Sequence, residues 1–433
     1  MRALHSTLFA AVALALAVPL QAQQTPDNDD AKFQPPTVVQ YLRPYDKRGI
    51  NIFETPKVEN IPYTGFALQW GAAFTQQFQS LDHETDGSTA LKEIGAGFNN
   101  AAANLYMNAQ VAPGIRVQLT TYLSSRHHPE PYVKDGFLQI DASPLDVPFF
   151  HKLMEVTTLK VGHFQVNYGD FQFRRTDNGN AMYNPLVGNA LMDAFTTEVG
   201  VEAIVQKNGI FGVLAATGGE IKGRVDAPDD RKPAYMAKLG FDRQLNDDLR
   251  VRLSGSFRMT ESSISNSIYS GDRAGSRYYF VTEATTATES ANFTSGRINP
   301  GFTDKQSAFM INPFIKFRGA EFFGMYESAK GRSAAETSER EVTQMMAEGV
   351  YRMGRSENFY LAARWNNVSG DVGTAAPDAD VTRMNFGGGW YVTPSLLMKA
   401  EYVTQEYKGF NGAADTRNGG KFNGFMIEAV LAF

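Results

Sequence analysis

Residues 66–78 read FALQWGAAFTQQF, in which large apolar side chains and small or polar side chains tend to alternate. Successive side chains of a β-strand point to opposite faces, so this period of two predicts a strand with one apolar and one polar face. A soluble sandwich also contains such strands. The fold is therefore decided by how often the pattern recurs and by what connects its copies.

Similar alternation recurs in fifteen further segments, which brings the prediction to sixteen strands. Most segments have the length of about 9 to 11 residues, or slightly more, that a tilted strand needs to cross a bilayer. They cover residues 98–111, 115–126, 132–141, 157–168, 198–207, 209–217, 233–242, 249–261, 306–317, 320–331, 340–352, 358–369, 380–392, 395–407 and 421–433. The faces of 209–217 and 320–331 can be assigned either way.

The connections between these segments alternate in length. Short turns at 112–114, 207–209, 318–320 and 393–395 are interleaved with long polar loops at 79–97, 262–305, 368–380 and 408–420. Short periplasmic turns and long external loops are typical of outer-membrane barrels, whereas a soluble sandwich has no reason to sort its loops in this way. Residues 143–156 depart from the pattern, because they form a long connection at the periplasmic end with room for a short helix.

These features predict an all-β fold, a transmembrane antiparallel β-barrel of about sixteen strands. The last strand supports a lipid-facing exterior, because its apolar residues share one parity and Glu428 lies on the other. A barrel of this size has a lumen wide enough for water, so we expect inward charges to remain solvated. The terminal Phe433 is also typical of bacterial outer-membrane proteins.

Composition excludes several other classes of protein. The 433 residues include 46 acids, 41 bases and no cysteine, with a formal net charge of −5. Beyond residue 22 there is no uninterrupted apolar run of about 20 residues, which a helical membrane protein would repeat. The scattered bases argue against nucleic acid as a partner. The absence of cysteine removes disulfides, thiol catalysis and thiolate metal sites.

The N-terminus has the features of a secretory signal. Arg2 precedes an apolar stretch at 8–20, and Ala22 ends a plausible cleavage site, so residues 1–22 are predicted to be removed on export. A membrane anchor is the alternative. Residues 23–62 lack a sustained period and are predicted to be a periplasmic lead-in, followed by the barrel at 63–433. The expected location is the outer membrane of a Gram-negative bacterium, in contact with its lipid.

A group of short motifs resembles a known family. Residues 159–170 read LKVGHFQVNYGD, and TDN at 176–178, YNP at 183–185 and TEVGVE at 197–202 follow. This stretch is similar to the phosphate-selective porin O and P family, and the similarity covers the barrel from about residue 63 onward. The resemblance implies a sixteen-stranded channel, often a homotrimer, whose third external loop folds into the lumen.

The loop in question here is 171–196, whose apolar residues are unusual for a freely solvated tip. An external loop packed on its neighbours is the alternative. The candidate constriction residues in and beside this loop are Asp170, Arg174, Arg175, Asp177, Tyr183 and Asp193. Phosphate-selective members line the pore with a dense ladder of bases, which this sequence does not show.

Strand parity also supplies candidate pore-lining bases. These are Arg116, Arg252, Arg258, Arg364, Arg383 and Lys399. Inward acids are nearly as numerous, so we expect a mixed wall with a weak anion preference at most, because selectivity needs like charge at the narrowest point. For any single charge, a structural role in hydrating or bracing the wall is the alternative.

Three functions remain open on these grounds. The first is a porin for passive diffusion of small hydrophilic solutes and ions, and the second is a selective channel for phosphate or another anion. The third is a barrel with a structural, adhesive or enzymatic role. No constellation of histidine, serine and acids suitable for catalysis is visible, so we predict no enzymatic activity, no metal and no cofactor.

Overall fold

The structure is a computed structural model, and it describes residues 37–57, 59–99, 101–124, 126, 130–271, 277–292, 296–373 and 376–433. The predicted signal peptide at 1–22 lies outside these residues, and its cleavage stays a prediction. No helix in the described part of the chain is long and apolar enough to cross a membrane.

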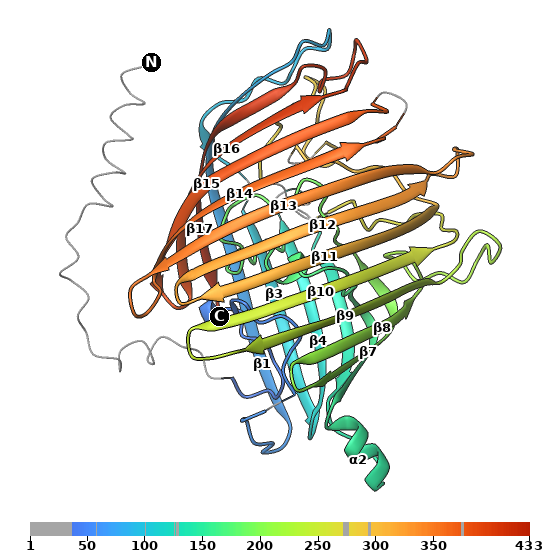
Figure 1. The fold of residues 1–433 in the computed structure, drawn as a ribbon, viewed down its shortest axis with the longest axis vertical. Coiled ribbons are helices and arrows are strands. Elements are labelled where there is room, and N and C mark those ends of the chain that lie inside the picture. The colour runs from blue at the N-terminus through green and yellow to red at the C-terminus, as the bar shows by residue number, and fades with distance from the viewer. Residues whose placement is uncertain are drawn as a thin grey trace. The chain divides into compact units, whose positions relative to one another are not determined.

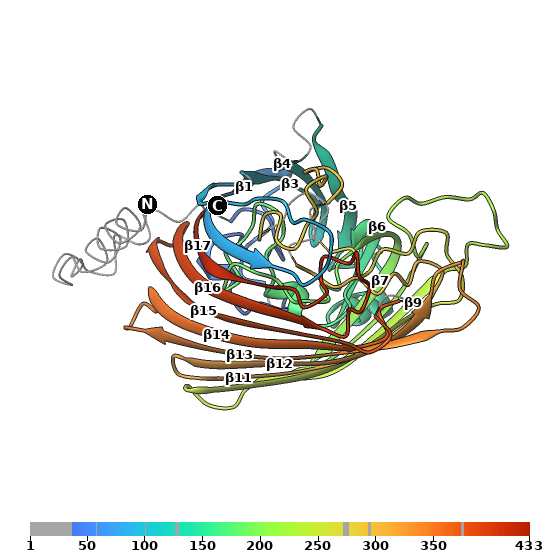
Figure 2. The ribbon, with the colours of Figure 1, turned by 90° about the horizontal axis from the view of Figure 1, so that it is seen from above.

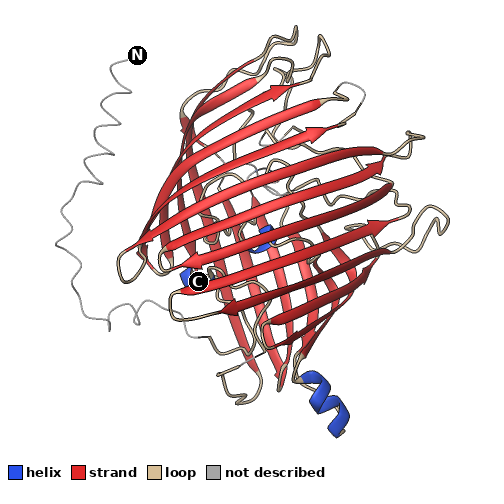
Figure 3. Ribbon diagram, viewed as in Figure 1, coloured by secondary structure: helices blue, strands red, loops and turns tan. Residues whose placement is uncertain are grey.

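One antiparallel sheet contains all seventeen strands found in the described residues, and setting aside the two-residue β2 leaves sixteen (Figures 1 and 3). Their bounds are β1 Ala67–Glu84, β2 Gly97–Phe98, β3 Ala102–Ala112, β4 Ile115–Ser124, β5 Tyr132–Ile140, β6 Thr157–Gln165, β7 Thr197–Lys207, β8 Ile210–Thr217, β9 Ala234–Gln244, β10 Leu249–Thr260, β11 Lys305–Phe317, β12 Ala320–Arg332, β13 Arg340–Met353, β14 Phe359–Gly370, β15 Ala379–Thr393, β16 Leu396–Lys408 and β17 Lys421–Ala432.

The sheet closes on itself. From β3 to β17 each long strand pairs with the next along the chain, and β1 pairs with β3 on one side and β17 on the other. Figure 2 shows the strands arranged around an interior that contains further chain. Because the sheet closes, most backbone groups of the strands are paired within the ring, as a lipid environment requires. The predicted sixteen-stranded barrel is confirmed.

Most strand bounds lie within a few residues of the predicted segments. The largest difference is β1, which continues to Glu84 because it pairs with β17 as far as Lys421. Its pairing with β3 ends at Thr75, and the short β2 pairs with it further on. The residues 79–84, predicted as part of a loop, are therefore strand.

Short and long connections lie at opposite ends of the strands, as predicted. Turns at 113–114, 208–209, 245–248, 318–319, 354–358 and 394–395 define a short-turn end. The connections at 166–196, 218–233, 261–304, 371–378 and 409–420 define a long-loop end. The exceptional connection 141–156 contains the helix α2, Pro148–Met154, at the short-turn end (Figure 1).

The two faces of the strands differ as predicted, with one addition. Phe66, Trp70 and Phe425 are exposed on the outer face, whereas Gln77 and Glu428 are buried on the inner one. The segments 209–217 and 320–331, whose faces could be assigned either way, each have a defined inner face in the structure. These inner faces carry apolar as well as polar residues. On β12 the inner residues are Glu321, Phe323, Met325 and Glu327. The interior therefore contains an apolar core in addition to polar groups.

Candidate functional site

Three segments pack against the inner faces of the strands. They are the N-terminal residues 37–57, the connection 166–196 between β6 and β7, and parts of the connection 261–304 between β10 and β11. Each contributes fully buried side chains, such as Phe53, Leu191 and Tyr278. Phe171 contacts Phe323 of β12 with ring centroids 6.2 Å apart, so apolar loop residues meet apolar positions of the wall.

The segment 171–196 contacts several distant strands through its backbone. The amides of Val187, Leu191 and Met192 donate to Glu401, Asn366 and Gln344, at 2.7, 2.6 and 2.9 Å. These acceptors lie on β16, β14 and β13. On β1, the Thr75 hydroxyl donates to the Gly179 carbonyl at 2.6 Å. The segment is therefore attached to the inner face on strands far from its own ends.

Asp170 connects the start of this segment to the wall. Its carboxylate lies 2.7 Å from Arg252 Nε and 2.6 Å from Lys238 Nζ. Burial alone would raise the pKa of Asp170, but Lys238 and Arg252 outweigh it and hold that pKa well below its usual range. The group is therefore a carboxylate at neutral pH and, together with Glu54, balances the charges of two buried cations.

The other candidate constriction residues are also paired. Arg174 donates to Glu348 at 2.8 Å, and Arg175 lies 2.7 Å from Asp193 within the same segment. Asp177 lies 2.7 Å from Lys134 of β5. Burial raises the pKa of Tyr183 to about 12 in spite of the nearby Arg43, so the neutral hydroxyl donates to the Pro44 carbonyl.

The six candidate pore-lining bases are buried on the inner face, each at most 4% exposed. Five contact a partner directly across the interior or on a neighbouring strand: Arg252 with Asp170, Arg258 with Glu198, Arg364 with Glu348, Arg383 with Gln405 and Lys399 with Glu428. Our expectation that inward charges remain solvated is wrong for these residues. The inserted segments exclude much of the solvent, so the charges need partners.

Arg174 and Arg364 meet at one carboxylate, that of Glu348. Arg252 is the one candidate wall base that pairs with a candidate acid of the loop among the described contacts. Arg116 stands apart from this group, because its guanidinium contacts the amide oxygens of Gln118 and Gln139 at 3.0 and 2.7 Å. Among the contacts of the described residues, the expected pairing of a basic wall with acids of the inserted loop is seen at Arg252.

Sequence reasoning missed the N-terminal segment, here defined as residues 37–57. Tyr45 stacks on Tyr106 of β3 with ring centroids 3.7 Å apart. Glu54 lies 2.9 Å from Lys238 and 2.7 Å from Arg252. The sequence feature that could have revealed this segment is a run of aromatic and charged residues at 43–54, RPYDKRGINIFE. Such a run is less typical of a free linker.

The N-terminal segment also reaches the short-turn end of the barrel. The Lys47 amide donates to the Pro394 carbonyl in the turn between β15 and β16 at 3.0 Å. The Gly114 amide in the turn between β3 and β4 donates to the Gln40 side chain at 2.9 Å. These two turns belong to different parts of the ring, so the segment extends across this mouth.

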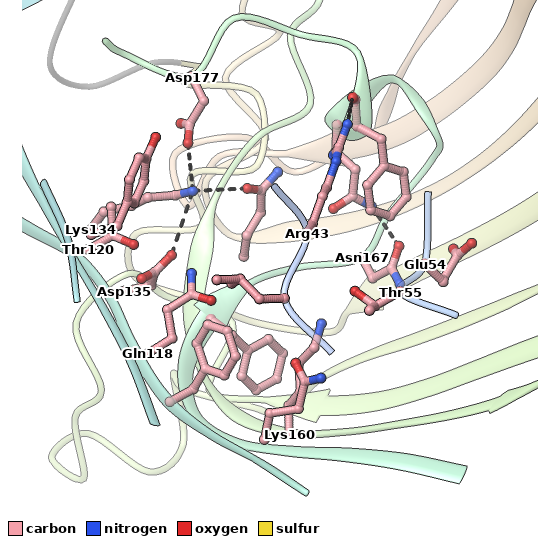
Figure 4. A pocket seen from close by; sticks show the side chains of 18 of the residues that line it. Arg43, Glu54, Thr55, Gln118, Thr120, Lys134, Asp135, Lys160, Asn167 and Asp177 are labelled. Atoms are coloured by element: carbon pink, nitrogen blue, oxygen red, sulfur yellow. Dashed lines mark hydrogen bonds and ion pairs between the residues drawn. The ribbon is translucent and has the colours of Figure 1, made fainter. Parts of the chain in front are cut away.

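A cavity of about 200 Å³ lies between the N-terminal segment, the wall from β3 to β6 and the start of the inserted loop. Its lining combines aromatic rings, side-chain amides and both signs of charge. Figure 4 shows Lys134 between Asp135 and Asp177, with Arg43 and Glu54 from the N-terminal segment nearby. In the described part of the chain, no group of three or more histidines and acids could hold a metal ion.

No protein-family model and no curated protein sequence matches this chain. Solved structures do match. The chain is similar to an anion-selective porin from Comamonas acidovorans at 10% identity and a TM-score of 0.53, covering 85% of this chain and 100% of that one. It is similar to OmpT, an outer-membrane protein of Vibrio cholerae, in its trimer form at 13% identity and 0.52, with the same coverages.

A third match is OprB of Pseudomonas putida, at 8% identity and a TM-score of 0.51, covering 85% of this chain and 94% of that one. At these identities the comparisons establish the fold. The chain has the fold of outer-membrane porin barrels. The narrower resemblance to phosphate-selective porins is not confirmed.

Proposed function

We propose that this protein is an outer-membrane channel through which small hydrophilic solutes and ions diffuse passively. The observation that carries the proposal is the division of the closed ring into an apolar outer face and an inner face rich in polar and charged residues. An apolar exterior is stable in lipid, and a polar interior provides sites for water and solutes. The solved porins of the same fold add support.

The inserted segments define what kind of channel we propose. Residues 171–196 and the N-terminal segment occupy much of the interior and are fastened by buried ion pairs. The remaining path is therefore narrow, and we propose that Asp170, Arg174 and Arg175 lie beside it. The role assigned is transport, with no catalytic step.

Single-channel recording in planar bilayers tests the proposal. Purified protein that shows heat-modifiable migration is expected to insert with discrete, small, ohmic steps in potassium chloride. Liposome swelling with sugars of increasing size then gives the size limit. Folded protein that produces neither current nor swelling would contradict a channel function and would favour a structural or adhesive barrel.

A homotrimer belongs to the same proposal. One solved relative in fold is described as a trimer form. An apolar depression on the outer surface over β1, β3, β4 and β17, bordered by Phe74, Leu123 and Leu431, is available for a neighbouring subunit or for lipid. Native mass spectrometry in detergent is expected to give three times the mass of the chain, and a monomer mass would contradict the assembly alone.

A further inference from the structure

The cavity of about 200 Å³ beside the N-terminal segment is lined by two arginines, Arg43 and Arg116, that form no ion pair with a carboxylate among the described residues. We propose that this cavity binds a small organic monocarboxylate, which Arg116 and Arg43 hold from two sides. The inference rests on the proposed channel function, which it deepens by naming a class of solute.

Arg116 projects from β4 and is 4% exposed. Its two terminal nitrogens contact only the neutral amides of Gln118 and Gln139, and its Nε has no hydrogen-bond partner among the described residues. Two acids, one on β5 and one in the connection after it, have other partners. Asp135 lies 3.6 Å from Lys134, and Asp141 accepts from the Thr158 hydroxyl and lies 3.4 Å from Lys57.

Arg43 belongs to the N-terminal segment and is also without a carboxylate partner in the described structure. Its guanidinium donates to the Gly49 and Phe173 carbonyls, at 2.7 and 2.9 Å, and lies 3.8 Å from the centroid of the Tyr183 ring. Carbonyl oxygens and an aromatic ring orient a guanidinium without cancelling its charge. Arg43 thus adds a second positive charge to the same cavity.

The remaining cations of the lining differ from these two. Lys134, Lys160 and Arg175 each lie within 2.9 Å of a carboxylate, from Asp177, Glu202 and Asp193 respectively. A buried charge is ordinarily paired, because leaving it without a counter-charge is strongly unfavourable. Against this local pattern, the two unneutralised arginines mark a place where an anion from outside the chain would be stabilised.

The lining also indicates which anion fits. A guanidinium presents a planar fork of donors that matches the two oxygens of a carboxylate. Phe137, Phe164 and Phe173 provide apolar surface for a carbon skeleton, which inorganic phosphate lacks. Asp135 and Asp177 lie on the same lining and would repel a second negative charge. The volume corresponds to about six waters at about 30 Å³ each, so the solute is small.

Calorimetric titration of the detergent-solubilised, heat-modifiable protein tests the proposal with three probes: benzoate, benzyl alcohol and inorganic phosphate. We expect benzoate to bind saturably, and benzyl alcohol and phosphate to bind at least tenfold more weakly. Arg116→Gln and Arg43→Gln are each expected to weaken benzoate binding about tenfold, whereas Arg116→Lys retains part of it. Arg318→Gln is the matched control, because Arg318 is 70% exposed at the short-turn rim.

Each result has a separate meaning. Equal binding of benzoate to wild type and to folded Arg116→Gln would overturn the site, as would tighter binding of phosphate or benzyl alcohol. Heat-modifiability shows whether a variant is folded, and Arg43→Gln lies outside the strands and provides a second test. Conductance in potassium chloride without benzoate binding would refute the site and leave the channel function intact. Benzoate binding without conductance would refute the channel function and leave the binding site intact.

Discussion

Arg252 and Asp170 form a two-contact ion pair that joins β10 to the segment following β6. Nε lies 2.7 Å from Oδ2, and a terminal nitrogen lies 2.8 Å from Oδ1. Lys238 approaches the same carboxylate, and Glu54 of the N-terminal segment lies 2.7 Å from Arg252. A single cluster therefore connects the barrel wall to the loop 171–196 and to the N-terminal segment. Its loss is expected to loosen these two segments together.

Replacement of Asp170 by Ala tests this connection. Removing one partner of a buried pair typically costs about 3 to 5 kcal/mol, because the remaining charge is left without its counter-charge. The barrel itself has its own network of strand hydrogen bonds, so we expect the loop to detach while the ring stays closed. Single-channel conductance should rise and become noisier. Unchanged conductance in a folded variant would show that the pair does not hold the loop.

Lowering the pH should protonate Asp170 and weaken the same ion pair. The pKa of Asp170 is held below its usual value of 3.8, so its stabilising contribution is present above that pH and is lost as the pH falls below it. We expect wild-type conductance to rise reversibly only well below pH 3.8, as the pH approaches the depressed pKa of Asp170, and Asp170→Ala to lack this transition. A transition of the same size in Asp170→Ala would assign it to another carboxylate.

The strands could be predicted from the sequence because their outer faces are predominantly apolar and their period is local. The interior could not, because its chemistry depends on partners far along the chain. Phe323 and Met325 made β12 ambiguous, since an apolar inner residue is unexpected in a watery lumen. They are explained by the inserted loop, with Phe171 packed against Phe323.

The charges show the same limitation. Parity predicted that Arg252 and Lys399 face inward, and both do, but it could not identify Asp170 or Glu428 as their partners. The contribution of Glu54 was missed altogether, because the aromatic and charged run at 43–54 does not show which strands the segment contacts. Their role in selecting solutes stays a prediction.

The centre of the inserted loop is held to the barrel wall by hydrogen bonds from two wall cations. Residues 180–189 include the carbonyls that accept from Arg364 and Lys399, such as those of Gly188 and Leu186. Deleting 180–189 should raise conductance and admit larger sugars, with the ring still heat-modifiable. Deleting residues 226–229 of another loop, which are exposed apart from the half-buried Ala227, is the control. Equal size limits for the two deletions would place the narrowest point elsewhere.

The N-terminal segment offers an independent test of occlusion. The double variant Tyr45→Ala, Glu54→Gln removes the stacking on Tyr106 and one partner of Lys238 and Arg252. We expect the segment to leave the short-turn mouth and conductance to rise. Proteolysis at 37–57 in folded protein should accelerate in the variant. Faster proteolysis without a change in current would mean that the segment does not narrow the path.

Ion preference depends on the balance of buried charge. Replacing Arg252, Arg258 and Arg383 by Gln removes three inner cations and leaves acids such as Asp170 and Glu198 with fewer counter-charges. The zero-current potential in a salt gradient should then shift toward cations. Arg243→Gln, Arg318→Gln and Arg417→Gln together remove the same charge from the surface, where salt screens it beyond about 8 to 10 Å. Because of this screening, the zero-current potential of the surface triple variant should change little. A change as large as that of the inner variant would mean that selectivity follows the net charge of the protein rather than these three inner arginines.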